Sequence, residues 1–106
     1  MRRGEIYWAR LPPPSGRRPV LVVTRTGVLD ARTSITVVPV TRTIRAIPSE
    51  LPLGRGNGLR AKSVANCDTL QTVPKALLGP RPIGRLTPLE LIQLDGALRF
   101  ALGIRA

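Results

Sequence analysis

Prolines and glycines interrupt this chain often, and only one segment combines the start signals of a helix with apolar residues at helical spacing. There are 11 prolines and 10 glycines among 106 residues, and the apolar runs between them are short and rich in β-branched residues. The exception follows Thr87-Pro88-Leu89-Glu90. It offers a Thr N-cap, a Pro at the first helical position and a Glu three residues after the cap. We therefore expect several short strands followed by one C-terminal helix.

The apolar runs predict where the strands lie. Residues 5–11 alternate in the manner of a first strand. The run from Pro19 to Thr24 is apolar on both faces, which is typical of a buried central strand. Pro39 cannot donate a hydrogen bond to a ladder, so it indicates an edge or a bulge. We expect strands over residues 5–11, 19–24, 33–43 and 61–70, a glycine-rich turn over 54–58 that closes a hairpin, and one helical turn over 74–78.

The C-terminal helix is predicted to pack against the sheet through an apolar face. Gly103 can end this helix. The order of elements predicts an α+β fold in one domain, residues 1–106, with a small, strongly twisted antiparallel sheet or partial barrel. The expected packing face consists of Leu91, Leu94, Leu98, Ala101 and Leu102, which recur at helical spacing.

Charge and composition limit the chemistry that this chain can perform. The chain has 17 Lys+Arg and 6 Asp+Glu, a net charge of +11, which predicts an anionic partner. It has no histidine and a single cysteine, Cys67. An internal disulfide, a Cys-rich zinc site and any catalytic triad that depends on histidine are therefore excluded. We expect no metal and no cofactor, and we expect Cys67 to be a small buried hydrophobe.

The sequence predicts a cytoplasmic protein that is not inserted in a membrane. No apolar run approaches the roughly 18 residues that a membrane span needs. Met1-Arg2-Arg3 is followed by Gly4-Glu5, whereas a signal peptide continues with an apolar segment.

Two short segments carry the candidate site residues. Gly16-Arg17-Arg18-Pro19 places two guanidinium groups at the start of a predicted strand, a rigid position from which to hold a phosphate. Pro39-Val40-Thr41-Arg42-Thr43 ends another apolar strand with a hydroxyl and a guanidinium. The alternative interpretation is that the arginines are solvated surface charges and that Thr41 is simply a good strand former.

Five short blocks follow one another along the chain. They are Arg3 to Trp8, Arg18 to Val23, Val37 to Thr41, Ser63 to Val73, and Pro82 to Leu86 leading into the final helix. In order and spacing these blocks resemble the MazF/PemK family of toxin ribonucleases, and the resemblance spans nearly the whole chain.

The resemblance implies a fold, an activity and a set of partners. The implied fold is a twisted, partly closed, SH3-like sheet, and the implied activity is metal-independent cleavage of single-stranded RNA by a homodimer. The resemblance further implies an acidic antitoxin as inhibitor. The family's two catalytic positions fall on Arg18 and Thr41, and Arg17, Arg42 and Asp68 are further candidate RNA contacts. The chemistry agrees, since a fixed arginine and a hydroxyl can stabilise the charge that builds on a phosphate when a ribose 2′-OH attacks it.

The chain departs from the family pattern in two places, and two other functions remain as alternatives. Many members have Glu-Gln-x-Arg-Thr where this chain has residues 68–72, Asp-Thr-Leu-Gln-Thr, and the loop over 12–17 is shorter and lacks acidic residues. One alternative is a DNA gyrase poison of the CcdB type, suggested by fold likeness and a faint Gly103-Ile104 match. The other is a basic RNA-binding module, although aromatic content is only 3%. Trp8 is expected in the core, with base stacking as the alternative.

Overall fold

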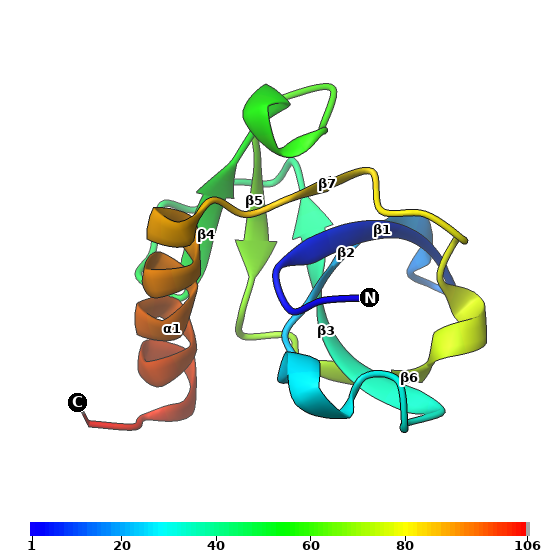
Figure 1. Ribbon diagram of the computed structural model, residues 1–106. Coiled ribbons are helices and arrows are strands. Elements are labelled where there is room, and N and C mark those ends of the chain that lie inside the picture. The colour runs from blue at the N-terminus through cyan, green and yellow to red at the C-terminus, as the bar shows by residue number, and fades with distance from the viewer. Residues whose placement is uncertain (106) are drawn as a thin grey trace.

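A curled antiparallel sheet forms most of the molecule, and one helix packs beside it (Figure 1). The computed structural model describes residues 1–105. The strands follow the order β4-β5-β3-β2-β1-β7, and β6 joins β3 outside this path. The elements are β1 (Glu5–Leu11), β2 (Gly16–Val22), β3 (Ser34–Thr41), β4 (Glu50–Leu53), β5 (Ser63–Asn66), β6 (Gln71–Pro74), β7 (Gly84–Arg85), α1 (Pro88–Leu102) and the 3-10 turns η1 (Thr26–Val28), η2 (Arg55–Asn57) and η3 (Lys75–Leu77).

The long strand β3 organises the sheet because it changes partner along its length. One side of β3 pairs with β2, while the other side pairs first with β6 and then with β5. The β6 ladder ends at Val37 and the β5 ladder begins at Val40. Pro39 lies at this changeover, where its missing N–H costs no ladder bond. The prediction of an edge or bulge at Pro39 was therefore wrong: Pro39 is buried in a central strand and pairs with Val20.

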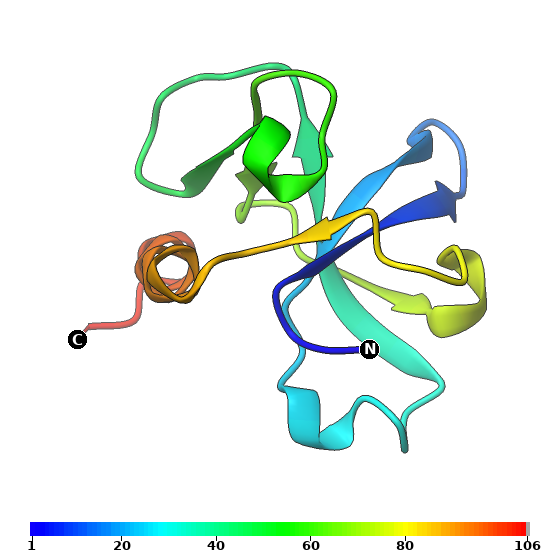
Figure 2. The same ribbon diagram turned by 45° about the horizontal axis from the view of Figure 1, so that its top comes forward.

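The sheet has an apolar core on each of its faces. Successive residues of a strand point to opposite faces, so Leu21 and Val38 belong to one core while Val20, Val22 and Val37 belong to the other. The first core fills the space between the sheet and α1. The second lies inside the curl of the sheet, among β1, β2, β3 and β6 (Figure 2).

Helix α1 begins and ends as the sequence predicts. The Thr87 side chain accepts a hydrogen bond from Glu90 N–H, the Glu90 carboxylate accepts one from Thr87 N–H, and Gly103 ends the helix with φ of 68°. The predicted packing face was wrong in one position. Leu102 is 55% exposed, whereas Ala97 is buried in its place, because the helix contacts the sheet mainly through its middle turns around Leu94 and Ala97.

Several strand boundaries differ from the predictions. β2 begins at Gly16, three residues before Pro19, and the predicted strand over 61–70 shortens to β5, residues 63–66, while β6 begins only at Gln71. A turn separates them because the Asn66 side chain accepts a hydrogen bond from Asp68 N–H and donates one to Thr69 Oγ1. The short strands β4, β6 and β7 were not predicted. β4 and β5 form the expected hairpin, and none of the helices within residues 1–105 is long and apolar enough to cross a membrane.

The loop that follows β4 is held against β7 by a close backbone contact between two glycines. A Cβ atom on Gly84 would lie 1.6 Å from the carbonyl oxygen of Asn57. We expect Gly84→Ala to lower the free energy of unfolding by at least about 2 kcal/mol, because backbone must move to admit the methyl group. The melting temperature of the variant measures this loss. Gly27→Ala is the matched control, since a Cβ there meets no atom within 4 Å; equal melting temperatures for the two variants would contradict the prediction.

Candidate active site

Arg18 and Thr41 lie opposite each other where β2 and β3 separate. The last ladder pairs are Val22 with Val37, Leu21 with Val38 and Val20 with Pro39. Continuing this register two residues further places Arg18 across from Thr41. Beyond Val20, β2 keeps β1 as its partner and β3 takes β5, so the sheet is open between the two residues. The sequence placed these residues far apart in the chain, and the fold brings them to the two edges of one opening.

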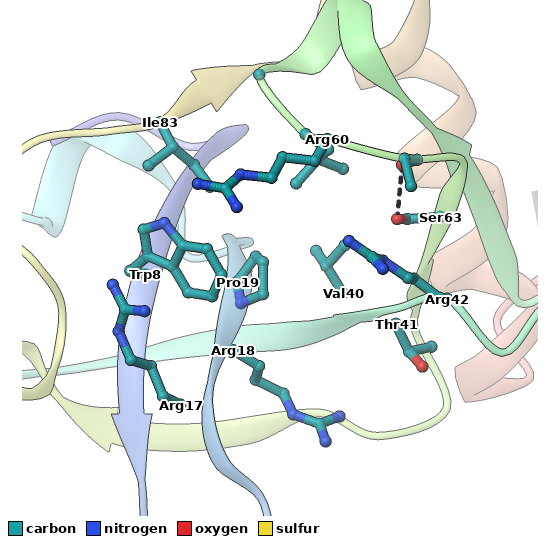
Figure 3. Close-up of a pocket in the computed structure, with 13 residues that line it drawn as sticks. Trp8, Arg17, Arg18, Pro19, Val40, Thr41, Arg42, Arg60, Ser63 and Ile83 are labelled. Atoms are coloured by element: carbon teal, nitrogen blue, oxygen red, sulfur yellow. Dashed lines mark hydrogen bonds between the residues drawn. The ribbon is translucent and has the colours of Figure 1, made fainter.

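Strand alternation divides the predicted site residues between the two faces of the sheet. Arg18 and Thr41 extend to one side of their strands, while Arg17 and Arg42 extend to the other, toward Trp8 (Figure 3). Adjacent residues of a strand point in opposite directions, so neither pair of neighbours in the sequence can act on one face. The predicted basic pair of Arg17 and Arg18 is therefore two separate features.

Both predicted catalytic side chains are oriented by the backbone around them. Arg18 Nε donates a hydrogen bond to the carbonyl oxygen of Ser15 at 3.3 Å. Thr41 Oγ1 accepts a hydrogen bond from Thr43 N–H at 3.1 Å. These bonds use the Nε of the arginine and a lone pair of the hydroxyl. The terminal guanidinium nitrogens and the threonine O–H remain as donors for an anion.

Arg18 and Thr41 line a polar pocket of about 230 Å³. Hydroxyl and amide groups surround it, which are the groups that hydrogen-bond the edges of unpaired bases. We call this hollow the polar pocket. Its other lining residues are Ser15, Pro39, Thr43, Arg45, Glu50, Asn66, Thr69 and Gln71.

Glu50 contributes the single carboxylate among the residues that line the polar pocket. Its side chain is buried, and Oε1 accepts hydrogen bonds from Arg45 N–H at 2.9 Å and Ala46 N–H at 3.0 Å. These two bonds tie the loop after β3 to the start of β4. Since Thr43 and Arg45 belong to that loop, Glu50 positions part of the pocket wall.

A second pocket, of about 330 Å³, opens on the other face of the sheet. Trp8, Pro19, Val40 and Ile83 form its apolar surface, and Arg17, Arg42 and Arg60 add positive charge (Figure 3). The Arg17 guanidinium lies 4.3 Å from the centre of the Trp8 ring, a cation–π contact. We call this hollow the Trp8 pocket. Arg18 and Thr41 also belong to its rim, so the two pockets meet at the opening between β2 and β3.

Comparison with known proteins identifies the family. The family model of the PemK-like, MazF-like toxin of type II toxin–antitoxin systems matches residues 2–102. The chain belongs to this family. A relative named endoribonuclease MazF3, from Mycobacterium tuberculosis, is 43% identical over 86 residues, which are 81% of this chain and 79% of the relative.

Solved structures of MazF toxins share the fold. The Mycobacterium tuberculosis toxin MazF-mt6 superposes with a TM-score of 0.89 at 37% identity, covering 96% of this chain and 99% of that one. A mycobacterial endoribonuclease in complex with its cognate antitoxin gives a TM-score of 0.86 at 28% identity, covering 100% of this chain and 98% of that one. The curled sheet with one C-terminal helix is thus the fold of MazF toxins, as the sequence predicted.

The remaining candidates of this MazF-like chain occupy different places. Asp68 lines neither pocket; its carboxylate accepts a hydrogen bond from the buried Ser49 hydroxyl at 2.5 Å, at the turn between β5 and β6. Cys67 is buried as predicted, and burial, followed by the charge of Asp68, raises the pKa of its thiol to about 11. The thiol is therefore protonated at neutral pH and unsuited to nucleophilic chemistry.

Sequence reasoning missed several residues that the fold brings to the site, among them Arg60 and Glu50. Arg60 reaches the Trp8 pocket from the loop after η2, and Glu50 reaches the polar pocket from β4. Neither lies in a segment with a recognisable functional pattern. Nothing in the sequence shows that Glu50 is buried, and nothing distinguishes Arg60 from the other arginines. Within the described residues no group of three or more Cys, Asp or Glu is placed to hold a metal ion.

Proposed function

We propose that this protein is a sequence-specific endoribonuclease, the toxin of a type II toxin–antitoxin system, and that Arg18 and Thr41 act on the scissile phosphate of single-stranded RNA. Membership of the MazF-like family supports the endoribonuclease activity, since relatives that match most of the chain are named endoribonucleases. The observation that supports the choice of Arg18 and Thr41 is that both have unused hydrogen-bond donors and lie at one opening of the sheet. The substrate is messenger RNA, which places the activity in the cytoplasm.

The proposed reaction uses a nucleophile that belongs to the substrate. The ribose 2′-oxygen attacks the adjacent phosphorus, a new O2′–P bond forms and the P–O5′ bond breaks. The 2′-OH loses its proton, and the departing 5′-oxygen gains one. Negative charge builds on the non-bridging oxygens meanwhile, and the Arg18 guanidinium with the Thr41 hydroxyl stabilises it. The products are a 2′,3′-cyclic phosphate and a 5′-hydroxyl.

The direct test is incubation of the protein with a long single-stranded RNA in the presence of EDTA. An endoribonuclease that relies on Arg18 and Thr41 cleaves the RNA at discrete sites under these conditions. An RNA-binding module would retard the RNA in a gel without cutting it. A gyrase poison would leave the RNA intact, and the family assignment already disfavours that alternative. Mapping of the new 5′ ends then gives the recognised sequence.

We further propose that the protein acts as a homodimer. Large apolar side chains lie exposed along the outer side and end of α1: Leu89, Ile92, Phe100, Leu102 and Ile104. Such a surface on a small domain is typical of an interaction site. Two copies carry a net charge of 2 × 11 = +22, which attracts RNA over a long range. Sedimentation equilibrium is expected to show a dimer at micromolar concentration; a monomer there would contradict this proposal.

The inhibitor in this proposal is an acidic antitoxin segment that orders on binding and covers Arg18. A chain with a charge of +11 binds acidic partners quickly, and a mycobacterial relative was solved with its cognate antitoxin. We expect the bound antitoxin to protect Arg18 from modification by phenylglyoxal. Arg32, exposed in the loop before β3, serves as the internal control. Equal modification of Arg18 in the free and bound states would rule out occlusion.

A further inference from the structure

The Trp8 pocket is a second feature of the site, and the catalytic role proposed for Arg18 and Thr41 does not use it. Trp8 is only half-buried, although it is the largest side chain of β1 and lies on the same face as the fully buried Ile6. Pro19 and Val40 form an apolar surface beside it. The structure thus leaves an aromatic ring accessible at the edge of the core instead of burying it.

The charged groups around this pocket are all of one kind. Arg17, Arg42 and Arg60 line the pocket, Arg18 borders it, and none of its lining residues is acidic. The Arg17 guanidinium already lies on the Trp8 ring. An aromatic ring within a cluster of arginines has the chemistry of a single-stranded nucleic-acid site, in which bases stack on the ring and phosphates contact the guanidinium groups. The pocket does not match an aliphatic ligand, which cannot pair with the positive charge of the arginines.

The pocket is continuous with the proposed catalytic site. Arg18 and Thr41 border both the Trp8 pocket and the polar pocket, at the opening where β2 and β3 part. A strand whose scissile phosphate lies at Arg18 can therefore extend one nucleotide to each face of the sheet. On one face its base meets hydroxyls and amides, and on the other it meets the ring of Trp8.

On these grounds we propose that the Trp8 pocket binds a nucleobase next to the scissile phosphate by stacking. This proposal rests on the endoribonuclease function proposed above and names Trp8 as a binding residue. Stacking tolerates any base because every base has a π face. The two pockets consequently differ in what they read: the polar pocket selects a base through hydrogen bonds, and the Trp8 pocket adds affinity with little selection.

The single tryptophan of the chain makes this proposal directly measurable. The wild-type protein is titrated with a fluorescein-labelled oligonucleotide that contains its cleavage site and carries 2′-O-methyl ribose throughout, so that it binds without being cut. The anisotropy of the fluorescein reports binding. In a parallel titration with the unlabelled oligonucleotide, tryptophan fluorescence reports the environment of Trp8. We expect the Trp8 emission to be quenched on binding. A single abasic nucleotide on one side of the cut is expected to restore most of the emission and to weaken binding about 10-fold.

Variants at Trp8 separate stacking from a purely structural role. Trp8→Phe keeps an aromatic ring, and Trp8→Leu keeps only apolar volume. With RNA substrate we expect Trp8→Leu to raise KM about 10-fold with kcat nearly unchanged, and Trp8→Phe to raise KM much less. On the substrate with the abasic nucleotide, both variants are expected to match the wild type, because the stacking partner is gone. A folding defect would instead lower activity on both substrates.

Two results would overturn the proposal and leave the endoribonuclease function intact. In the first, the oligonucleotide binds by anisotropy and the matching RNA is cleaved, but Trp8 emission is the same with the intact oligonucleotide and with every abasic one. The second is a Trp8 emission that changes with protein concentration or with added antitoxin and not with oligonucleotide, which would assign the pocket to a protein interface. Loss of RNA cleavage by the wild-type protein would instead contradict the proposed function itself.

Discussion

An RNA in which one deoxyribose replaces the ribose before the cut is expected not to be cleaved, although it still binds. The proposed reaction takes its nucleophile from that 2′-OH, so removing one oxygen atom removes the reaction. Binding persists because phosphate contacts dominate the affinity of a protein with a charge of +11. The measurement compares cleavage rate and dissociation constant for the two substrates, and the expected loss is in the rate alone.

The position of the substitution supplies the control for this experiment. A deoxyribose two nucleotides outside the recognised sequence should leave the rate within a factor of about two, because no bond to that sugar changes. Mass spectrometry of the products cleaved from the unsubstituted RNA should find a 2′,3′-cyclic phosphate and a 5′-hydroxyl. Cleavage of the deoxy substrate at full rate, or a 5′-phosphate product, would mean that an external water attacks the phosphorus.

Local signals were strong enough to predict the helix and the longer strands. The Thr87 cap, its reciprocal bond with Glu90 and the end at Gly103 depend on neighbouring residues only, and the structure has all three. The strands β4, β6 and β7 escaped prediction because they are only two to four residues long. Pairing with distant segments defines such strands. Pro39 was misread for the same reason: its tolerance in a central strand depends on where β6 ends and β5 begins.

Some members of the candidate site could be proposed from the sequence, but its arrangement could not. The spacing of the family blocks pointed to Arg18 and Thr41, and the fold places them across one opening. The separation of Arg17 from Arg18 onto opposite faces follows from strand alternation, but only once β2 is known to begin at Gly16. Arg60 comes from a loop whose path depends on the contact between Gly58 and β7. No local sequence pattern predicts that contact, because the two segments are far apart in the chain.

Neighbouring residues on opposite faces provide matched variants for the mechanism. We expect Arg18→Ala to lower kcat for RNA cleavage by at least about 10²-fold, because the charge on the phosphate then loses its guanidinium partner. Thr41→Ala is expected to cost a comparable or smaller factor, since one neutral donor is lost. Steady-state kinetics on a short RNA, with circular dichroism to confirm folding, measures both effects.

Arg17 and Arg42 are the sequence neighbours of Arg18 and Thr41, and their side chains extend to the other face of the sheet (Figure 3). Arg17→Ala and Arg42→Ala therefore each remove one positive charge from that other face. They are expected to raise KM and to leave kcat within a few-fold of the wild type, because their guanidinium groups point toward the Trp8 pocket. Arg32 lines neither pocket, so Arg32→Ala controls for the loss of one positive charge. If Arg17→Ala lowered kcat as much as Arg18→Ala does, net charge would explain the effect. A large kcat effect confined to Arg18 and Thr41 requires the phosphate to lie on their face of the sheet, where both residues line the polar pocket.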